Sequence, residues 1–194
     1  MVDKAGNEVE GKILYSVNRF GSVYQYGKET SELLANYYTK EGQELQITET
    51  NVDTLTKSRI TYSRGGEIVT LTEGENYKVS MSGGEDSMKQ YHYTIYKENF
   101  QEEGEYSVVL TSQDAAENQA DNRLKGKEIQ FVVDRTAPSI VFSGVEEKGQ
   151  YEEHTREISL NVEDNIGTKT WKYGVTTRWY KALMLRQSPL EMER

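Results

Sequence analysis

Polar and apolar residues alternate in short runs along most of the chain, a pattern typical of β-strands with one face against a core. The clearest runs are Tyr91–Tyr96, Tyr106–Leu110 and Ile129–Val133, in which every second residue is apolar or aromatic. Shorter runs of this kind are Ile13–Val17, Leu45–Ile47, Ile68–Leu71, Ile140–Phe142 and Ile158–Val162. Because turn residues such as Gly65-Gly66 separate the runs, the pattern predicts an all-β fold in which antiparallel strands form a β-sandwich.

One segment has helical character instead. Thr30 offers a hydroxyl that can cap a helix, and an early acid, Glu32, precedes three apolar residues, Leu33-Leu34-Ala35. We therefore predict a short helix over residues 30–38, in the connection before the strand at Leu45.

The chain contains an internal repeat. Asp3–Asn7 and Asp114–Asn118 both read Asp-x-Ala-x-Asn. Each is followed by a strand-like run that ends in Asn-Arg or Asp-Arg, Ile13–Arg19 and Ile129–Arg135. The first blocks are 111 residues apart (3 to 114) and the second blocks 116 (13 to 129). Since this spacing is about one domain length, each copy is predicted to be the closing hairpin of a separate sandwich.

The segment Glu102–Tyr106 reads acid-x-Gly-x-Tyr and stands directly before a strong strand. This order favours a tyrosine corner, in which the Tyr106 hydroxyl bonds to the corner backbone; a plain glycine turn is the alternative. Val108 stands where antibody domains carry a cysteine. The chain has no cysteine, so no disulfide supports this strand.

A stiff joint is predicted at Asp134–Pro138, because Pro138 fixes its own φ and extends the residue before it. With this Asp-x-Thr-Ala-Pro joint and the Asp-x-Ala-x-Asn segments, residues 1–167 resemble the tandem bacterial Ig-like domains of cell-surface proteins. Asp3–Asn7 matches that family's Asp-x-Ala-Gly-Asn segment fully, whereas Glu117 replaces the usual glycine in the second copy. The resemblance implies an immunoglobulin-like sandwich and names no ligand.

The resemblance implies one complete domain between two partial ones. We expect residues 1–19 to be the last strand of a preceding Ig-like domain, 20–136 a complete sandwich, and 137–167 the first strands of a following domain. The start at Met1 is expected to be internal or artificial. Residues 168–194 hold both tryptophans and lose the period of two. We interpret them as a non-native tail from a reading-frame shift; a genuine amphipathic helix at about 178–187 is the alternative.

Composition and charge narrow the classes of partner and of fold that the chain can have. The net charge is −9 and the pI about 4.9, which argue against nucleic acid or an anionic membrane as the main partner. The sequence contains neither a long apolar run nor an N-terminal signal peptide. Val, Ile, Leu and Phe together make up about 21% of the chain, 40 of 194 residues, and 14 tyrosines add surface that can be half buried. These numbers favour an ordered β protein with thin cores and polar surfaces.

Candidate chemistry is sparse, and we assign no catalytic, cofactor or metal residues. The two histidines, His92 and His154, stand in unrelated contexts, and no phosphate-binding loop occurs. Calcium at domain joints would involve Asp114, Asn118, Asp134 and Asp164, but turn formation is the favoured explanation of these residues. A Lys–Asn crosslink would need burial beside an acid. The tyrosines that could stack on sugars are Tyr24, Tyr26, Tyr37, Tyr38, Tyr91, Tyr93 and Tyr96.

The sequence therefore predicts a non-enzymatic structural or adhesive segment, a stalk, of a larger extracellular protein on a bacterial cell surface. Its expected partners are the neighbouring Ig-like domains of the same protein. The alternatives are a module that binds carbohydrate or a host protein, or an accessory domain of a secreted enzyme. The stalk interpretation predicts an acidic surface without special features, and the binding interpretation predicts a contiguous aromatic patch.

Overall fold

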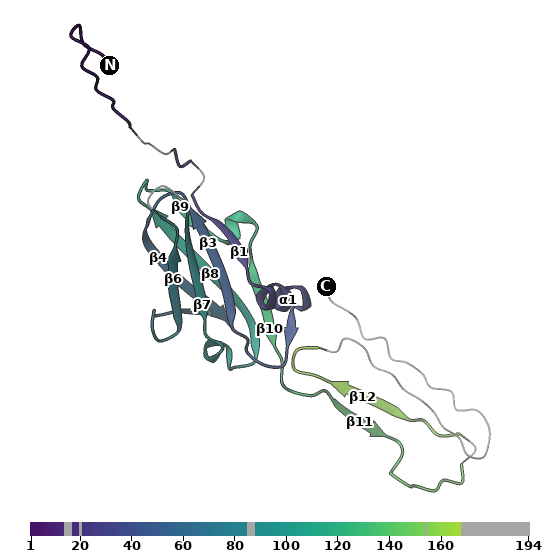
Figure 1. Ribbon diagram of the computed structural model, residues 1–194. Helices are drawn as coiled ribbons and strands as arrows, with labels where there is room; N and C mark the ends of the chain where they lie inside the picture. The colour runs from purple at the N-terminus through teal and green to yellow at the C-terminus, as the bar shows by residue number, and fades with distance from the viewer. Residues whose placement is uncertain (14–16, 20, 85–87, 154, 168–194) are drawn as a thin grey trace. The chain divides into compact units, whose positions relative to one another are not determined.

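The computed structural model describes residues 1–13, 17–19, 21–84, 88–153 and 155–167 (Figure 1). The chain divides into two compact units, Met1–Arg135 and Thr136–Arg194. The predicted strand at Ile13–Val17, His154 and the tail 168–194 fall partly or wholly outside the described residues.

Two β-sheets make up the first unit. The four-stranded sheet has the order β1 (Val23–Tyr26), β3 (Leu45–Asn51), β7 (Lys89–Ile95) and β6 (Tyr77–Ser82). The larger sheet has the order β2 (Tyr38–Thr39), β10 (Ile129–Val133), β8 (Gly104–Asp114), β4 (Leu55–Arg64) and β5 (Glu67–Thr70), and β9 (Gln119–Asp121) pairs with β8. Every described pairing is antiparallel except that of β2 with β10. The predicted all-β class with antiparallel sheets is confirmed.

The facing side chains of the two sheets share one hydrophobic core, because both sheets follow the alternation seen in the sequence. Tyr106, Val108 and Leu110 of β8 are buried, as predicted. The rings of Tyr106 and Phe131 stack with their centroids 5.4 Å apart, and Phe100 meets both edge-on. This aromatic group, which includes Phe100 from the short 3-10 helix η1 (Lys97–Phe100), fills the core beside the corner at Gly104.

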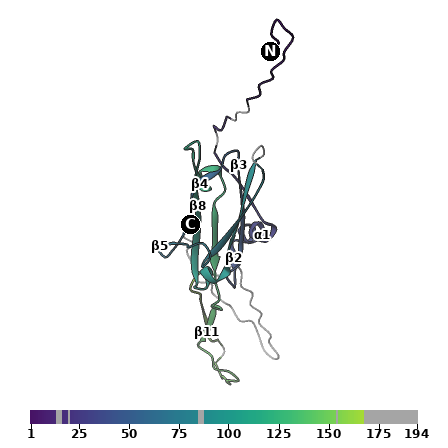
Figure 2. The same ribbon diagram turned by 60° about the vertical axis from the view of Figure 1, so that its left-hand side comes forward.

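The predicted helix exists but begins earlier than expected. α1 spans Lys28–Asn36, and its N-cap is Gly27, which makes no side-chain capping bond. The expectation that Thr30 caps the helix is wrong, because its hydroxyl is buried and accepts a hydrogen bond from the Gln46 backbone N–H at 2.8 Å. α1 contacts β3 and β10, on the side away from β4 and β5 (Figure 2).

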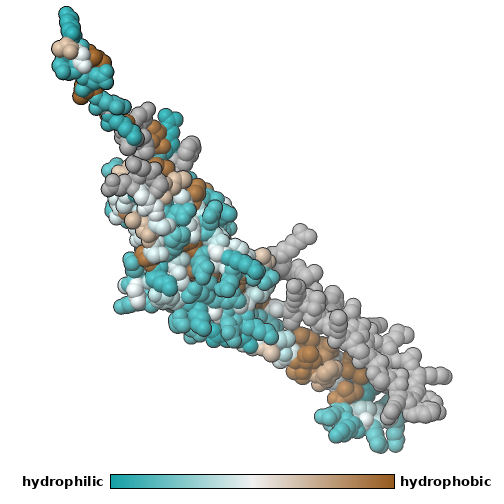
Figure 3. All heavy atoms as spheres, viewed as in Figure 1, coloured by the Kyte–Doolittle hydropathy of each residue, from teal (hydrophilic) through white to brown (hydrophobic). Residues whose placement is uncertain are grey.

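The second unit contains the antiparallel pair β11 (Ser139–Ser143) and β12 (Ser159–Glu163), which confirms both predicted strands. Ile140, Phe142, Leu160 and Val162 share one face of the pair, since Ile140 lies opposite Val162 and Phe142 opposite Leu160. The first three of these side chains are exposed and contribute to the brown surface of this unit in Figure 3. A second short 3-10 helix, η2 (Arg123–Lys125), belongs to the first unit.

Candidate functional site

A group of polar side chains gathers at the end of β8 where Asp114 stands. Asp114 and Asn51, the last residues of β8 and β3, are each 1% exposed. The Asn51 amide donates to the Asp114 carboxylate at 3.3 Å and to the Ser22 hydroxyl at 3.0 Å. Asn118 donates its backbone N–H to Asp114 Oδ1 at 2.9 Å and its side-chain amide to Oδ2 at 3.1 Å. The ends of the two sheets are thus joined through one carboxylate.

Asn18, five residues before β1, completes this group. Its Nδ2 donates to Asp114 Oδ2 at 2.7 Å, to Asn51 Oδ1 at 2.8 Å and to Asp53 Oδ2 at 3.2 Å. Its backbone carbonyl accepts from the Asn118 amide at 3.1 Å. We call Asn18, Asn51, Asp53, Asp114 and Asn118 the amide cluster. Sequence analysis named Asp114 and Asn118 as candidate site residues and Asn18 only as part of the repeat, whereas Asn51 and Asp53 carry no sequence signal.

The electrostatics of the amide cluster favour an ionised Asp114. Burial raises the pKa of Asp114, but hydrogen bonds from the Asn118 side chain and backbone and from Asn51 outweigh it and hold the pKa below its ordinary value. The negative charge therefore has its partners within the fold. This arrangement fits a structural role for the carboxylate.

The fold does not bring the four candidate calcium ligands together into one site. Of these four residues, Asp114 and Asn118 lie together, whereas β10 ends opposite Gly104, so the adjoining Asp134 lies at the other end of β8. Asp164, in the second unit, accepts from the backbone N–H groups of Ile166 and Gly167 at 3.0 and 2.6 Å, as a turn residue does. Within the described residues, no group of three histidine or acidic side chains is arranged to hold a metal ion.

A second polar group lies inside the core around Glu49 of β3, which is fully buried. Its carboxyl accepts hydrogen bonds from the hydroxyls of Tyr93 at 3.2 Å, Tyr24 at 3.4 Å and Ser112. Burial, and after it the adjacent Glu49, raise the pKa of both tyrosines. A Lys–Asn crosslink has no basis at this acid, because the buried side chains of the described residues include no lysine.

Two of the candidate tyrosines for sugar stacking are core residues. Tyr24 and Tyr93 are 3% and 2% exposed, so neither ring is available to a sugar. Tyr38 is 57% exposed, and the other candidates are partly buried. On the face of the first unit visible in Figure 3, hydrophilic side chains predominate. His92 is also engaged structurally, because its ring nitrogens lie 3.1 Å from the hydroxyl oxygens of Thr48 and Ser82.

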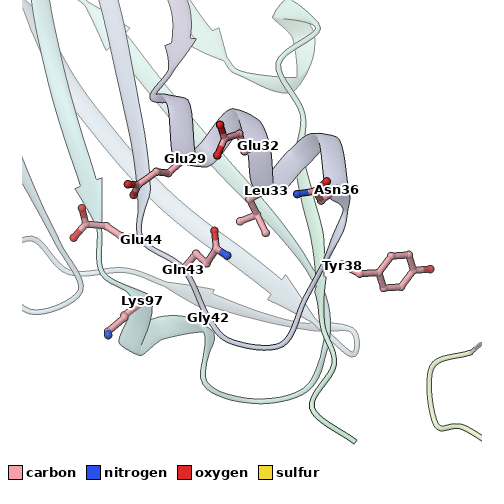
Figure 4. Close-up of a pocket in the computed structure, with 9 residues that line it drawn as sticks. All are labelled: Glu29, Glu32, Leu33, Asn36, Tyr38, Gly42, Gln43, Glu44 and Lys97. Atoms are coloured by element: carbon pink, nitrogen blue, oxygen red, sulfur yellow. The ribbon is translucent and has the colours of Figure 1, made fainter. Parts of the chain in front are cut away.

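A shallow groove of about 430 Å³ lies beside α1. Three carboxylates, Glu29, Glu32 and Glu44, face it together with one lysine, Lys97, and the Tyr38 ring points away from them (Figure 4). Its full lining is Glu29, Glu32, Leu33, Asn36, Tyr38, Gly42, Gln43, Glu44 and Lys97. The groove is thus acidic and polar, without the aromatic platform that sugar stacking needs.

Comparisons with known proteins give no relative on which to base a function. No family model, curated protein or solved structure matches the chain. No helix among the described residues is long and apolar enough to cross a membrane. The fold places the chain in the all-β class, and its function has to be inferred from the repeat and the amide cluster.

Proposed function

We propose that the chain is a non-enzymatic structural segment, a stalk or adhesive shaft, of a bacterial surface protein built from tandem immunoglobulin-like β-sandwiches. Residues 20–136 form the complete sandwich in this proposal, and its partners are neighbouring domains of the same protein. The observation that carries it is that the Asp-x-Ala-x-Asn turns of both copies of the repeat fold alike.

The two Asp-x-Ala-x-Asn segments make the same turn. In the first copy Asn7 donates its backbone N–H to Asp3 Oδ1 at 2.8 Å and its side-chain amide to Oδ2 at 2.7 Å. Asn118 makes the same pair of bonds to Asp114. The backbone bonds also correspond, because Asp3 N–H donates to the Asn7 carbonyl and Asp114 N–H to that of Asn118. The turn at the start of the repeat is therefore repeated in structure as well as in sequence.

The opening strands correspond in the same way. Arg19 precedes Val23, the first residue of β1, by four residues, and Arg135 precedes Ser139, the first residue of β11, by four. Val23 pairs with Thr50 in the first unit, and Ser139 pairs with Glu163 in the second. β11–β12 thus has the antiparallel arrangement of β1–β3. This correspondence supports successive domains of one design, as a shaft requires.

The decisive test is the gene on either side of this reading frame. We expect in-frame or frame-shifted sequence that encodes further sandwiches of about 116 residues per repeat, together with an export signal and a surface anchor. Flanking sequence with no sandwich-coding segment in any frame would overturn the proposal. The binding alternative is tested on a glycan array with the full chain, where specific retention that Glu29→Gln or Glu44→Gln abolishes would favour a ligand module.

A further inference from the structure

The segment just before β1, residues 17–19 and 21–22, is called the linker here. It is attached to the interior of the fold and not only to its edge. β1 has four residues and lies at the edge of its sheet, with β3 as its neighbour. An edge strand of this length has few ladder hydrogen bonds with which to resist peeling. If residues before β1 were held by β1 alone, a pull on them would act on the shortest strand of the sheet.

Asn18 donates hydrogen bonds to strands other than β1. They reach Asn51 at the end of β3 and Asp114 at the end of β8, and both acceptors are buried. β3 lies between β1 and β7, and β8 between β10 and β4, so each is an inner strand of its sheet. One side chain of the linker therefore holds both sheets.

The backbone around Asn18 is held as well. Its side-chain oxygen accepts from the Gly21 N–H at 3.2 Å, and its carbonyl accepts from the Asn118 amide. Gly21 has a φ of +60°, a conformation that glycine adopts at low cost and that lets the chain turn between Asn18 and β1. The linker is thus shaped so that its asparagine reaches the amide cluster.

We propose that Asn18 acts as a latch. Its hydrogen bonds to Asn51 and Asp114 transmit tension from the preceding chain to β3 and β8, so that β1 does not peel from its sheet. The inference rests on the proposed structural function, because only a protein under tension needs it. Asn7 provides a matched control, since its side chain bonds to Asp3 within its own turn.

The first measurement is hydrogen–deuterium exchange of the full chain. In Asn18→Ala we expect the amides of β1 to exchange at least fivefold faster than in the unaltered chain, because loss of one ordinary hydrogen bond produces a change of about that size and the substitution removes several. Asn18→Asp, which replaces the donor with a charge facing Asp114, should accelerate exchange further. Asn7→Ala should leave β1 unchanged. Equal exchange in all four proteins would overturn the latch.

The second measurement is force spectroscopy of the full chain held at its two ends. We expect Asn18→Ala to unfold at lower force than the unaltered chain, with an early extension step from the release of β1, and Asn7→Ala to behave as the unaltered chain. If the unaltered chain resists force and Asn18→Ala resists equally, the latch is wrong and the structural function stands. If the unaltered chain unfolds without measurable resistance, the structural function itself is wrong, and the exchange data alone decide whether Asn18 holds β1.

Discussion

Gly6 and Glu117 occupy the same position of two equivalent turns, and both have positive φ, +86° and +64° respectively. In each turn their N–H donates to the carbonyl of the aspartate three residues earlier, Asp3 or Asp114, at 3.1 Å. The turn thus requires the left-handed conformation at this position, which explains why glycine is favoured there. Glu117 adopts it at a steric cost that Gly6 avoids.

Glu117→Gly should therefore stabilise the first unit. Relief of the left-handed strain, less the greater entropy of an unfolded glycine, leaves a gain of about 1 kcal/mol. Glu117→Ala keeps the strain and serves as the control, with little expected change. Urea denaturation of the two variants and the unaltered chain measures the difference. A loss of stability in Glu117→Gly would show that the glutamate side chain stabilises the fold by more than the strain of the left-handed conformation costs.

The strands that the sequence predicted contain hydrophobic residues at alternating or adjacent positions, as β8 and β10 do in the core and as the exposed edge strand β5 does at Ile68 and Val69. β4 was missed because it has one fully buried residue, Ile60, among ten, although it lies between β8 and β5. Its side chains are mostly polar on both faces, so no period of two marks it. β1 and β6 were missed because each has a single buried residue, Tyr24 or Tyr77, and gives only a weak alternation.

The amide cluster could be anticipated only in part. The repeat identified Asp114 and Asn118, which are close in sequence. Asn18 and Asn51 reach them through hydrogen bonds that span 96 and 63 residues of the chain, and no local pattern signals such contacts. The alternation in Tyr91–Tyr96 places Tyr93 on the same face as the buried Ile95, but the sequence does not show that the hydroxyls of Tyr24 and Tyr93 are satisfied inside the core by Glu49.

The tyrosine corner is confirmed, because the Tyr106 hydroxyl donates to the Glu102 carbonyl at 2.9 Å. Tyr106→Phe removes this one bond while keeping the ring packed, and should cost about 1 kcal/mol in the free energy of unfolding. Val108→Asp places an unpaired charge at a fully buried position and should prevent stable folding. Circular dichroism during denaturation distinguishes the two. Small, equal effects of both substitutions would contradict the placement of β8 in the core.

The Glu49 carboxyl is expected to stabilise the core through its three hydroxyl donors. Glu49→Leu would leave the hydroxyls of Tyr24, Tyr93 and Ser112 without this acceptor, and each orphaned buried group costs about 1–3 kcal/mol. Glu49→Gln keeps one acceptor oxygen in a similar shape and should cost less. Chemical denaturation of both variants tests this order. Greater stability of the leucine variant would mean that the cost of burying the carboxyl exceeds the value of its hydrogen bonds.

Asp114 should make the stability of the first unit depend on pH in the acid range. Its pKa is lower in the fold than in the unfolded chain, so its contribution is complete above the ordinary aspartate value of about 3.9 and is lost as the pH falls through the lower, folded pKa. Asp3 and Asp121 also have lowered pKa values, so the total slope is not due to Asp114 alone. The comparison with Asp114→Asn isolates its part.

At pH 7, Asp114→Asn should cost about 1–3 kcal/mol, because the amides of Asn18, Asn51 and Asn118 lose a charged acceptor. As the pH falls below the ordinary aspartate value and through the lower, folded pKa, the carboxyl of the unaltered protein takes up a proton and loses the same advantage, so the two proteins should converge in acid. Urea unfolding at a series of pH values measures the gap. A gap that stays constant with pH would mean that Asp114 acts by shape alone, and a gap that widens in acid would contradict the direction of its pKa shift.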